Sequence, residues 1–296
     1  MNLLQLKILR KLRLTKCLHL NGQKEILGRR FSFPIRGQLG WGYLNDPEVW
    51  MSSLFEALKP YFRSNPQQCF LDVGVNLGQT LAKYRSVFPD GIYVGFEPNP
   101  ACIAYVNELI ELNHWDNIDL YPVGVAERHE ICTLNFFHNA SDDPTASIIK
   151  DFRPDQAIRR RSHIAVFPIA EASIKRPVSF LKIDVEGAEL EVLKGCRSVL
   201  VRDRPIVSTE ILPCYDGQNA FRIQRQQEVE ALMNRVGYKC FRIAKGGSQH
   251  SKLVGLQPVE SIEVHGEIEL SDYLWIHEES SAKITEMILE GLRHNK

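Results

Sequence analysis

From residue 68 onward, short apolar runs alternate with segments whose apolar positions recur every three or four residues. Runs that are apolar on both faces predict strands of a sheet covered on both sides, and the segments between them predict amphipathic helices. The predicted strands are CFLDVG (69–74), GIYVGFE (91–97), IDLYPVG (118–124), SFLKIDVE (179–186) and RPIVSTEI (204–211). Predicted helices at 77–88, 100–113 and 187–201 lie between three of the strand pairs. This pattern predicts an α/β fold with a doubly wound, mostly parallel sheet.

The first 65 residues predict an appendage made of a helix, a hairpin and a second helix. Residues 1–16 carry five basic side chains and no acid, with apolar residues spaced for one helical face. That face is expected to dock on the chain's own domain, and peripheral contact with an anionic membrane is the alternative. KEILGRRFSFPIRGQLG (24–40) predicts the hairpin, and NDPEVWMSSLFEALKPYF (45–62) predicts a helix capped by Asp46.

Residues 66–296 are expected to form the main domain, with an insertion at about 126–177. The alternating pattern breaks there, and the polar stretch 138–163 is placed where a segment covering the substrate would sit. A helix at 224–237 and a strand at 238–244 follow, and DYLWIH (272–277) is expected to form an edge strand.

Composition narrows the class of protein. The 36 basic and 36 acidic side chains cancel, so the net charge gives no attraction for nucleic acid. Seven cysteines form an odd number and include no CxxC, which argues against a disulfide framework or a zinc site and favours reduced thiols in a cytoplasmic compartment. No run approaches the roughly 20 apolar residues of a membrane-spanning helix, and residues 1–17 lack the unbroken apolar core of a secretory signal.

The stretch FLDVGVNLGQT (70–80) predicts a strand that enters a glycine turn and then a helix. Gly74 and Gly78 allow close approach of a ligand, and the helix start favours a carboxylate. Asp72, at the strand end, would oppose a pyrophosphate and favour an ammonium group. The pair suits an amino-acid zwitterion such as the methionine end of S-adenosylmethionine. Glu97 lies 19 residues beyond Gly78 (97 − 78), near the offset at which an acid meets ribose hydroxyls. A purely structural turn is the alternative.

A second chemical stretch is FLKIDVEGAEL (180–190). Lys182 and Asp184 share one face of the predicted strand, and Glu186 falls at the following turn. Glu210 ends the next predicted strand, so the three acids should cluster at adjacent strand ends. They could deprotonate an acceptor hydroxyl or hold a divalent cation. The alternative is an ion pair of Lys182 with Asp184 or Glu210 that only satisfies buried charge.

FLDVGVNLGQT, VGFEPNP (94–100), FLKIDVEGAELEVLKG (180–195) and RPIVSTEILP (204–213) resemble the motifs of the FkbM-type S-adenosylmethionine-dependent methyltransferases. The resemblance covers residues from about 24 to 277 and implies a Rossmann-like fold of the class I methyltransferase type. It implies methyl transfer to oxygen, often to a hydroxyl of a sugar or polyketide-type acceptor. On these motifs, cofactor binding falls to Asp72, Gly74, Asn76, Gly78, Thr80, Glu97 and Asn99. The reaction centre falls to Asp184 with Lys182, Glu186 and Glu210.

Other groups have two interpretations each. Gly124 and Val125 line the adenine pocket or merely end a strand. His129, His138 and His163 are solvated or include a base. Arg153, Arg159, Arg160 and Arg161 belong to a solvated loop or clamp an anionic group of the acceptor.

Two other functions stay open at this level: a nicotinamide-dependent oxidoreductase, disfavoured by the missing G-x-G-x-x-G, and a non-catalytic binding module of the same fold. The expected partner is a small-molecule or glycan acceptor. The expected location is the cytoplasm, with the inner membrane face as a peripheral site.

Overall fold

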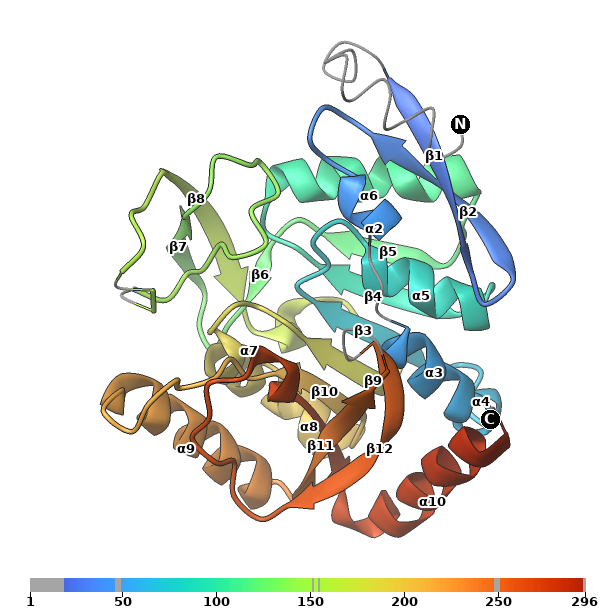
Figure 1. Cartoon of the computed structure of the whole chain (residues 1–296), viewed down its shortest axis with the longest axis vertical. Coiled ribbons are helices and arrows are strands. Elements are labelled where there is room, and N and C mark those ends of the chain that lie inside the picture. The colour runs from blue at the N-terminus through green and yellow to red at the C-terminus, as the bar shows by residue number, and fades with distance from the viewer. Residues whose placement is uncertain (1–18, 46–48, 151, 154, 248–250, 295–296) are drawn as a thin grey trace.

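The computed structural model describes residues 19–45, 49–150, 152–153, 155–247 and 251–294. Its largest sheet has the strand order β12-β11-β13-β10-β9-β3-β4-β5 (Figure 1). The five neighbouring strands from β10 to β5 run parallel to one another. They are β3 (Cys69–Val73), β4 (Ile92–Phe96), β5 (Ile118–Tyr121), β9 (Val178–Ile183) and β10 (Ile206–Glu210). The five strands predicted from the apolar runs are therefore confirmed, as is the α/β fold with a mostly parallel sheet.

Three antiparallel strands extend the sheet beyond β10: β13 (Asp272–His277), β11 (Tyr238–Gly246) and β12 (Lys252–Val259). The prediction that 272–277 forms an edge strand is wrong, because β13 lies between β10 and β11. Residues Tyr273 to Ile276 are fully buried, as an interior strand covered on both faces requires. The two edge strands are β5 and β12, and the apolar pattern does not predict β12.

Helices cover both faces of the sheet, which confirms the doubly wound arrangement. Phe70 of β3 and Phe180 of β9 pack in one core with α3 (Trp50–Ala57), α5 (Gln79–Val87) and α10 (Glu278–His294). Leu71 and Leu181, one position further along the same strands, pack on the opposite face. There they meet α7 (Glu189–Gly195), α8 (Arg197–Arg202) and α9 (Ala220–Arg235). Within the described ranges, no helix is long and apolar enough to cross a membrane.

The N-terminal hairpin is confirmed as β1 (Leu20–Ile26) paired with β2 (Arg29–Ile35). It lies across α6 (Pro100–Asn113) (Figure 1). Phe33 and Ile35 pack there against Tyr105 and Leu109. The helix predicted at 45–62 is found as α3 followed by α4 (Lys59–Arg63), and a short α2 (Trp41–Asn45) precedes it. The expected amphipathic segment 1–16 and the Asp46 cap lie outside the described residues. The domain boundary at 65/66 stays a prediction.

The insertion, together with the two residues before it, contains regular structure that the polar pattern does not reveal. β6 (Gly124–Val125), β8 (Arg160–Phe167) and β7 (Glu130–Phe136) form a separate three-stranded sheet in that order. β7 and β8 are antiparallel, and β6 runs parallel to β8. Figure 1 shows this sheet beside the carboxyl ends of β4 and β5. Residues of the connection between β7 and β8 line a cavity at these strand ends.

Candidate active site

Two cavities open at the carboxyl ends of the parallel strands, the place where open α/β sheets bind ligands. The first lies between β3, β4, β6 and the insertion. It contains about 780 Å³ of empty space, part of which is open to solvent. The second lies between the ends of β9 and β10 and the helices α3 and α5. Both are lined by Gly74, Asn76, Pro144, Asp184 and Glu186. These five residues form a wall that the two cavities share.

The turn after β3 has left-handed backbone at Gly74 (φ +90°), Asn76 (φ +50°) and Gly78 (φ +82°). A Cβ atom on Gly74 would lie 1.9 Å from the carbonyl oxygen of Asp184, so this glycine lets two neighbouring strand ends touch. A Cβ atom on Gly78 would lie 3.0 Å from Leu109 of α6. Gly78 lines neither cavity, so the cofactor contact expected of it stays a prediction.

Glu97 follows β4 and lies in the wall of the first cavity. Its two carboxylate oxygens accept hydrogen bonds from the backbone N–H groups of Asn76 and Asn99, both at 2.8 Å. Burial raises the pKa of Glu97 to about 7, although the two backbone hydrogen bonds oppose that shift. Asn99 also caps α6, because its side chain accepts the N–H of Ala101. The carboxylate therefore has one fixed orientation at the cavity wall.

Asp72 is fully buried and lines neither cavity. Its carboxylate accepts the hydroxyl of Tyr93 and lies 3.3 Å from the ammonium of Lys182. Lys182 also lies 3.3 Å from Asp184 and donates to the carbonyl of Gly74 at 2.8 Å. Asp72 thus meets an ammonium group, as expected of its position, but that group belongs to the protein. Its direct contact with a ligand stays a prediction.

The acids at the ends of β9 and β10 cluster as predicted. Asp184, Glu186 and Glu210 each place one carboxylate oxygen within 4.8 Å of the others. Burial and the Asp184 charge raise the pKa of Glu186 to about 8, against the opposing Arg153 guanidinium. Burial and the same Asp184 charge also raise the pKa of Glu210 well above its usual range. Such oxygens can accept a proton from an alcohol or ligate a divalent cation. Of the two ion pairs predicted for Lys182, the structure contains the one with Asp184.

The remaining residues predicted to belong to the site fall into two groups, those that line one of the cavities and those that line neither. Thr80 lines the second cavity, whereas Gly124 and Val125 line the first. His129 lies 3.2 Å from Glu171, His138 lies 3.0 Å from Asp143, and His163 lies 3.5 Å from Thr133. None of the three histidines lines either cavity, nor do Arg159, Arg160 and Arg161. Arg153 pairs with Glu186.

The apolar wall of the first cavity is not among the features predicted from the sequence. Leu134 of β7 and Ile164 and Val166 of β8 contribute to it, and these strands belong to the insertion, in which the apolar pattern predicts no strand. The run of four apolar residues in IAVF (164–167), which ends at Pro168, is the signal that could have revealed the second half of β8.

Comparison with known proteins adds to this geometry. The family model of the FkbM methyltransferase domain matches residues 72–240, which is more than half of the chain. Methyltransferase 1 of Beauveria bassiana (strain ARSEF 2860) is 24% identical over 148 residues, covering 44% of this chain and 59% of that protein. Methyltransferase sdnD of Sordaria araneosa is 25% identical over 159 residues, covering 45% and 61%. The match therefore spans about three fifths of each of these curated relatives.

Among solved structures, the methyltransferase FkbM from Methylobacillus flagellatus KT superposes with a TM-score of 0.44 at 17% identity, covering 79% of this chain and 50% of that one. The matched residues 72–240 include the glycine turn, Glu97 and the three clustered acids. This chain belongs to the FkbM family of S-adenosylmethionine-dependent methyltransferases.

Proposed function

We propose that the protein transfers the methyl group of S-adenosylmethionine to a hydroxyl oxygen of a sugar, a glycan or a related small molecule. The observation that carries the proposal is the cluster of Asp184, Glu186 and Glu210, of which the first two lie in the wall between two cavities. One cavity would hold the methyl donor and the other the acceptor, and the acids lie where the two would meet.

The first cavity fits the donor. Glu97 presents a carboxylate whose orientation is fixed by two backbone N–H groups, as recognition of ribose hydroxyls requires. Gly74 and Asn76 offer left-handed backbone at the strand end for the methionine part. Gly124, Val125 and the apolar residues of β8 form a wall suited to a flat adenine ring. S-adenosylmethionine supplies a methyl group that its sulfonium already activates.

The protein must then align an acceptor oxygen and receive its proton. Alignment can contribute roughly 7–11 kcal/mol. When the methyl carbon bonds to the acceptor oxygen, its bond to the sulfonium sulfur would break and the sulfur would keep that electron pair, which gives S-adenosylhomocysteine. The hydroxyl proton would pass to one of the clustered carboxylates. Such transfer typically contributes about 10²–10⁴-fold in rate. Holding a divalent cation, which would acidify the hydroxyl, is the second role that the same oxygens could serve.

An acceptor screen with a labelled methyl donor tests the proposal. Glycosides, sugar phosphates and hydroxylated small molecules would be offered, with S-adenosylhomocysteine measured as the second product. On the acceptor found, Asp184→Asn and Glu210→Gln should each lower kcat by about 100-fold or more, with a much smaller change in donor affinity. Glu130→Gln, at an exposed position of β7, is the matched control.

Three outcomes would change the assignment. Wild-type turnover in both variants would make the carboxylates structural partners of Lys182. Loss of turnover with a chelator, reversed by a divalent cation, would make them metal ligands. Absence of any S-adenosylhomocysteine across the screen would favour a non-catalytic binding module.

We also propose that the protein works in a reducing, cytoplasmic compartment. The six described cysteines are all free, and four of them, Cys69, Cys102, Cys196 and Cys214, are buried to within a few per cent of full coverage. Burial raises the pKa of Cys196 to about 12, so its thiol stays protonated and unreactive at neutral pH. Buried, protonated thiols of this kind form no disulfide bonds and need no oxidising compartment.

A further inference from the structure

The connection between β7 and β8 forms one side of the first cavity. We call residues 137–150 the covering segment. Asp142, Asp143, Pro144, Ala146 and Ile148 of this segment line the first cavity, and Pro144 also lines the second. A ligand enclosed between these residues and the strand ends can leave only if the covering segment moves or the mouth is wide enough. What holds the segment in place therefore bears on ligand release.

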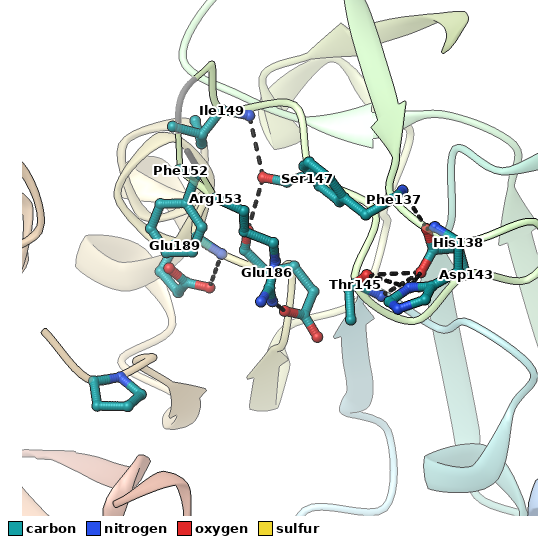
Figure 2. Close-up of polar contacts among 12 residues, drawn as sticks. Phe137, His138, Asp143, Thr145, Ser147, Ile149, Phe152, Arg153, Glu186 and Glu189 are labelled. Carbon is teal, nitrogen blue, oxygen red and sulfur yellow. Dashed lines mark hydrogen bonds and ion pairs between the residues drawn. The ribbon is translucent and has the colours of Figure 1, made fainter. Parts of the chain in front are cut away.

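Asp143 braces the covering segment internally. Its carboxylate has no exposed surface and accepts the backbone N–H groups of Phe137 (2.6 Å) and His138 (2.8 Å). It also accepts the hydroxyl of Thr145 at 2.7 Å and lies 3.0 Å from the His138 ring (Figure 2). Carboxylates that receive several such hydrogen bonds are strongly held in place. Residues 137–145 are therefore expected to move as one unit.

Two further contacts fasten the chain to the turn that follows β9. The Ser147 hydroxyl donates to the backbone carbonyl of Glu186 at 2.7 Å and accepts the N–H of Ile149 at 3.2 Å. Just beyond the covering segment, the Arg153 guanidinium donates to the Glu186 carboxylate. Figure 2 shows both side chains directed at Glu186 from the same stretch of chain. The insertion thus holds the backbone and the side chain of one residue.

The turn itself is of a kind that needs such support. Glu186 has φ +55°, a left-handed conformation that is uncommon for a residue other than glycine. The next residue, Gly187, packs against the Phe152 ring so closely that a Cβ atom would lie 2.6 Å from ring atoms. Phe152 is in turn fixed by Arg222 of α9, which donates to its carbonyl at 2.8 Å and lies over its ring at 4.0 Å.

We propose that Ser147 and Arg153 are positioning residues that keep the covering segment closed over the methyl donor and, through the same contacts, keep Glu186 in the wall shared with the acceptor cavity. This inference rests on the proposed function, because it takes the first cavity to be the donor site. Release of the product S-adenosylhomocysteine then requires both contacts with Glu186 to break. Each turnover consequently opens and reassembles the wall that the acceptor also touches.

The test measures dissociation of S-adenosylhomocysteine, which needs no acceptor. In Arg153→Met and Ser147→Ala, the dissociation rate should rise about tenfold or more, since each removes one contact that closure forms. Arg153→Lys keeps a cation and should recover most of the wild-type rate. Arg128→Met, at an exposed arginine of the same insertion that lines neither cavity, should leave the rate unchanged. In a Glu186→Gln background, Arg153→Met should add less than threefold.

Amide hydrogen exchange gives a second readout. Bound S-adenosylhomocysteine should protect residues 137–150 and 185–190 together in the wild type, and Arg153→Met should lose this ligand-dependent protection at a melting temperature close to that of the wild type. A purely structural role would instead raise exchange equally with and without ligand. If Arg153→Met does not fold, Ser147→Ala carries the test.

Unchanged dissociation rates in both folded variants would overturn this inference and leave the proposed function intact. Failure of the wild-type protein to bind S-adenosylhomocysteine would overturn both.

Discussion

Replacement of Gly74 by alanine should destabilise the protein more than the same change at Gly28, Gly78 or Gly217. The Cβ atom would lie 1.9 Å from the Asp184 carbonyl oxygen, whereas ordinary contacts begin at 3.4 Å. One strand end must therefore shift by about 1.5 Å (3.4 − 1.9) in a closely packed sheet. Overpacking of this kind costs about 1–3 kcal/mol, and an alanine at positive φ costs about 1–2 kcal/mol. We expect a loss of about 2–5 kcal/mol in the free energy of unfolding.

The other three glycines separate the two contributions. Gly28 has φ +76° with no atom within 4 Å of a Cβ, so Gly28→Ala should cost only the backbone strain. Gly78 has φ +82° and a side-chain contact at 3.0 Å, which a flexible leucine can relieve, so Gly78→Ala should cost slightly more than Gly28→Ala. Gly217 has neither feature, and Gly217→Ala should be near neutral.

Urea unfolding at one pH and temperature gives the free energies, provided that the slope stays constant across the series. Calorimetry with S-adenosylhomocysteine on each folded variant should show the largest loss of affinity for Gly74→Ala, because of these four glycines only Gly74 lines the proposed donor cavity. The reasoning is refuted if Gly74→Ala unfolds no more easily than Gly28→Ala, or if it binds S-adenosylhomocysteine as the wild type does.

Two further predictions concern buried charge. Lys182→Met should lower the free energy of unfolding in urea by about 3–5 kcal/mol, because it leaves the buried carboxylate of Asp72 without its ammonium partner. Adding Asp72→Asn should recover part of that loss. A double variant as unstable as Lys182→Met alone would contradict this prediction. Folding raises the pKa of Glu97 from 4.5 in the unfolded chain to about 7 in the folded protein. As the pH rises, the unfolded chain therefore loses this proton before the folded protein does. The contribution of Glu97 is therefore fully present below about pH 4.5 and falls between pH 4.5 and 7, by up to roughly 3 kcal/mol. Glu97→Gln should remove that pH dependence, and equal slopes in the two proteins would contradict the assignment.

The sequence predicts the parallel part of the fold well because its signals are local. β3 and β9 are short apolar runs followed by glycine turns, and α6 begins at a proline, so each is recognised from a few neighbouring residues. α6 is found at 100–113 as predicted. The place of β13 depends instead on pairing with β11 and β10, which are distant in the chain. A strand pattern alone does not say which neighbours a strand takes. β8 is missed for a different reason, because its first half is polar and exposed and so lacks an apolar strand pattern.

The site shows the same division. Clustering of Asp184 and Glu210 follows from a general rule about strand ends, so it could be predicted. The pairing of Lys182 with Asp72 could not, because it depends on the register between β3 and β9, in which these two residues are direct neighbours. Without that register, the sequence predicts as partners of Lys182 only Asp184 on the same strand and Glu210 at the end of the next one. Long-range register thus decides which buried charge an ammonium group meets.

The wall that the two cavities share and the outer side of the second cavity should differ in how well they tolerate substitutions. The shared wall is built by strand ends that touch: the Gly74 carbonyl accepts from Lys182, and the Gly74 Cα faces the Asp184 carbonyl. A change at this wall disturbs both cavities at once. The outer side of the second cavity comes from elements outside the parallel strands, with Trp50 from α3, Lys245 from β11 and Glu269 from the short helix at Ile268–Leu270. Substitutions there leave the strand ends in place, so we expect acceptor preference to be set by these outer residues while donor binding stays constant.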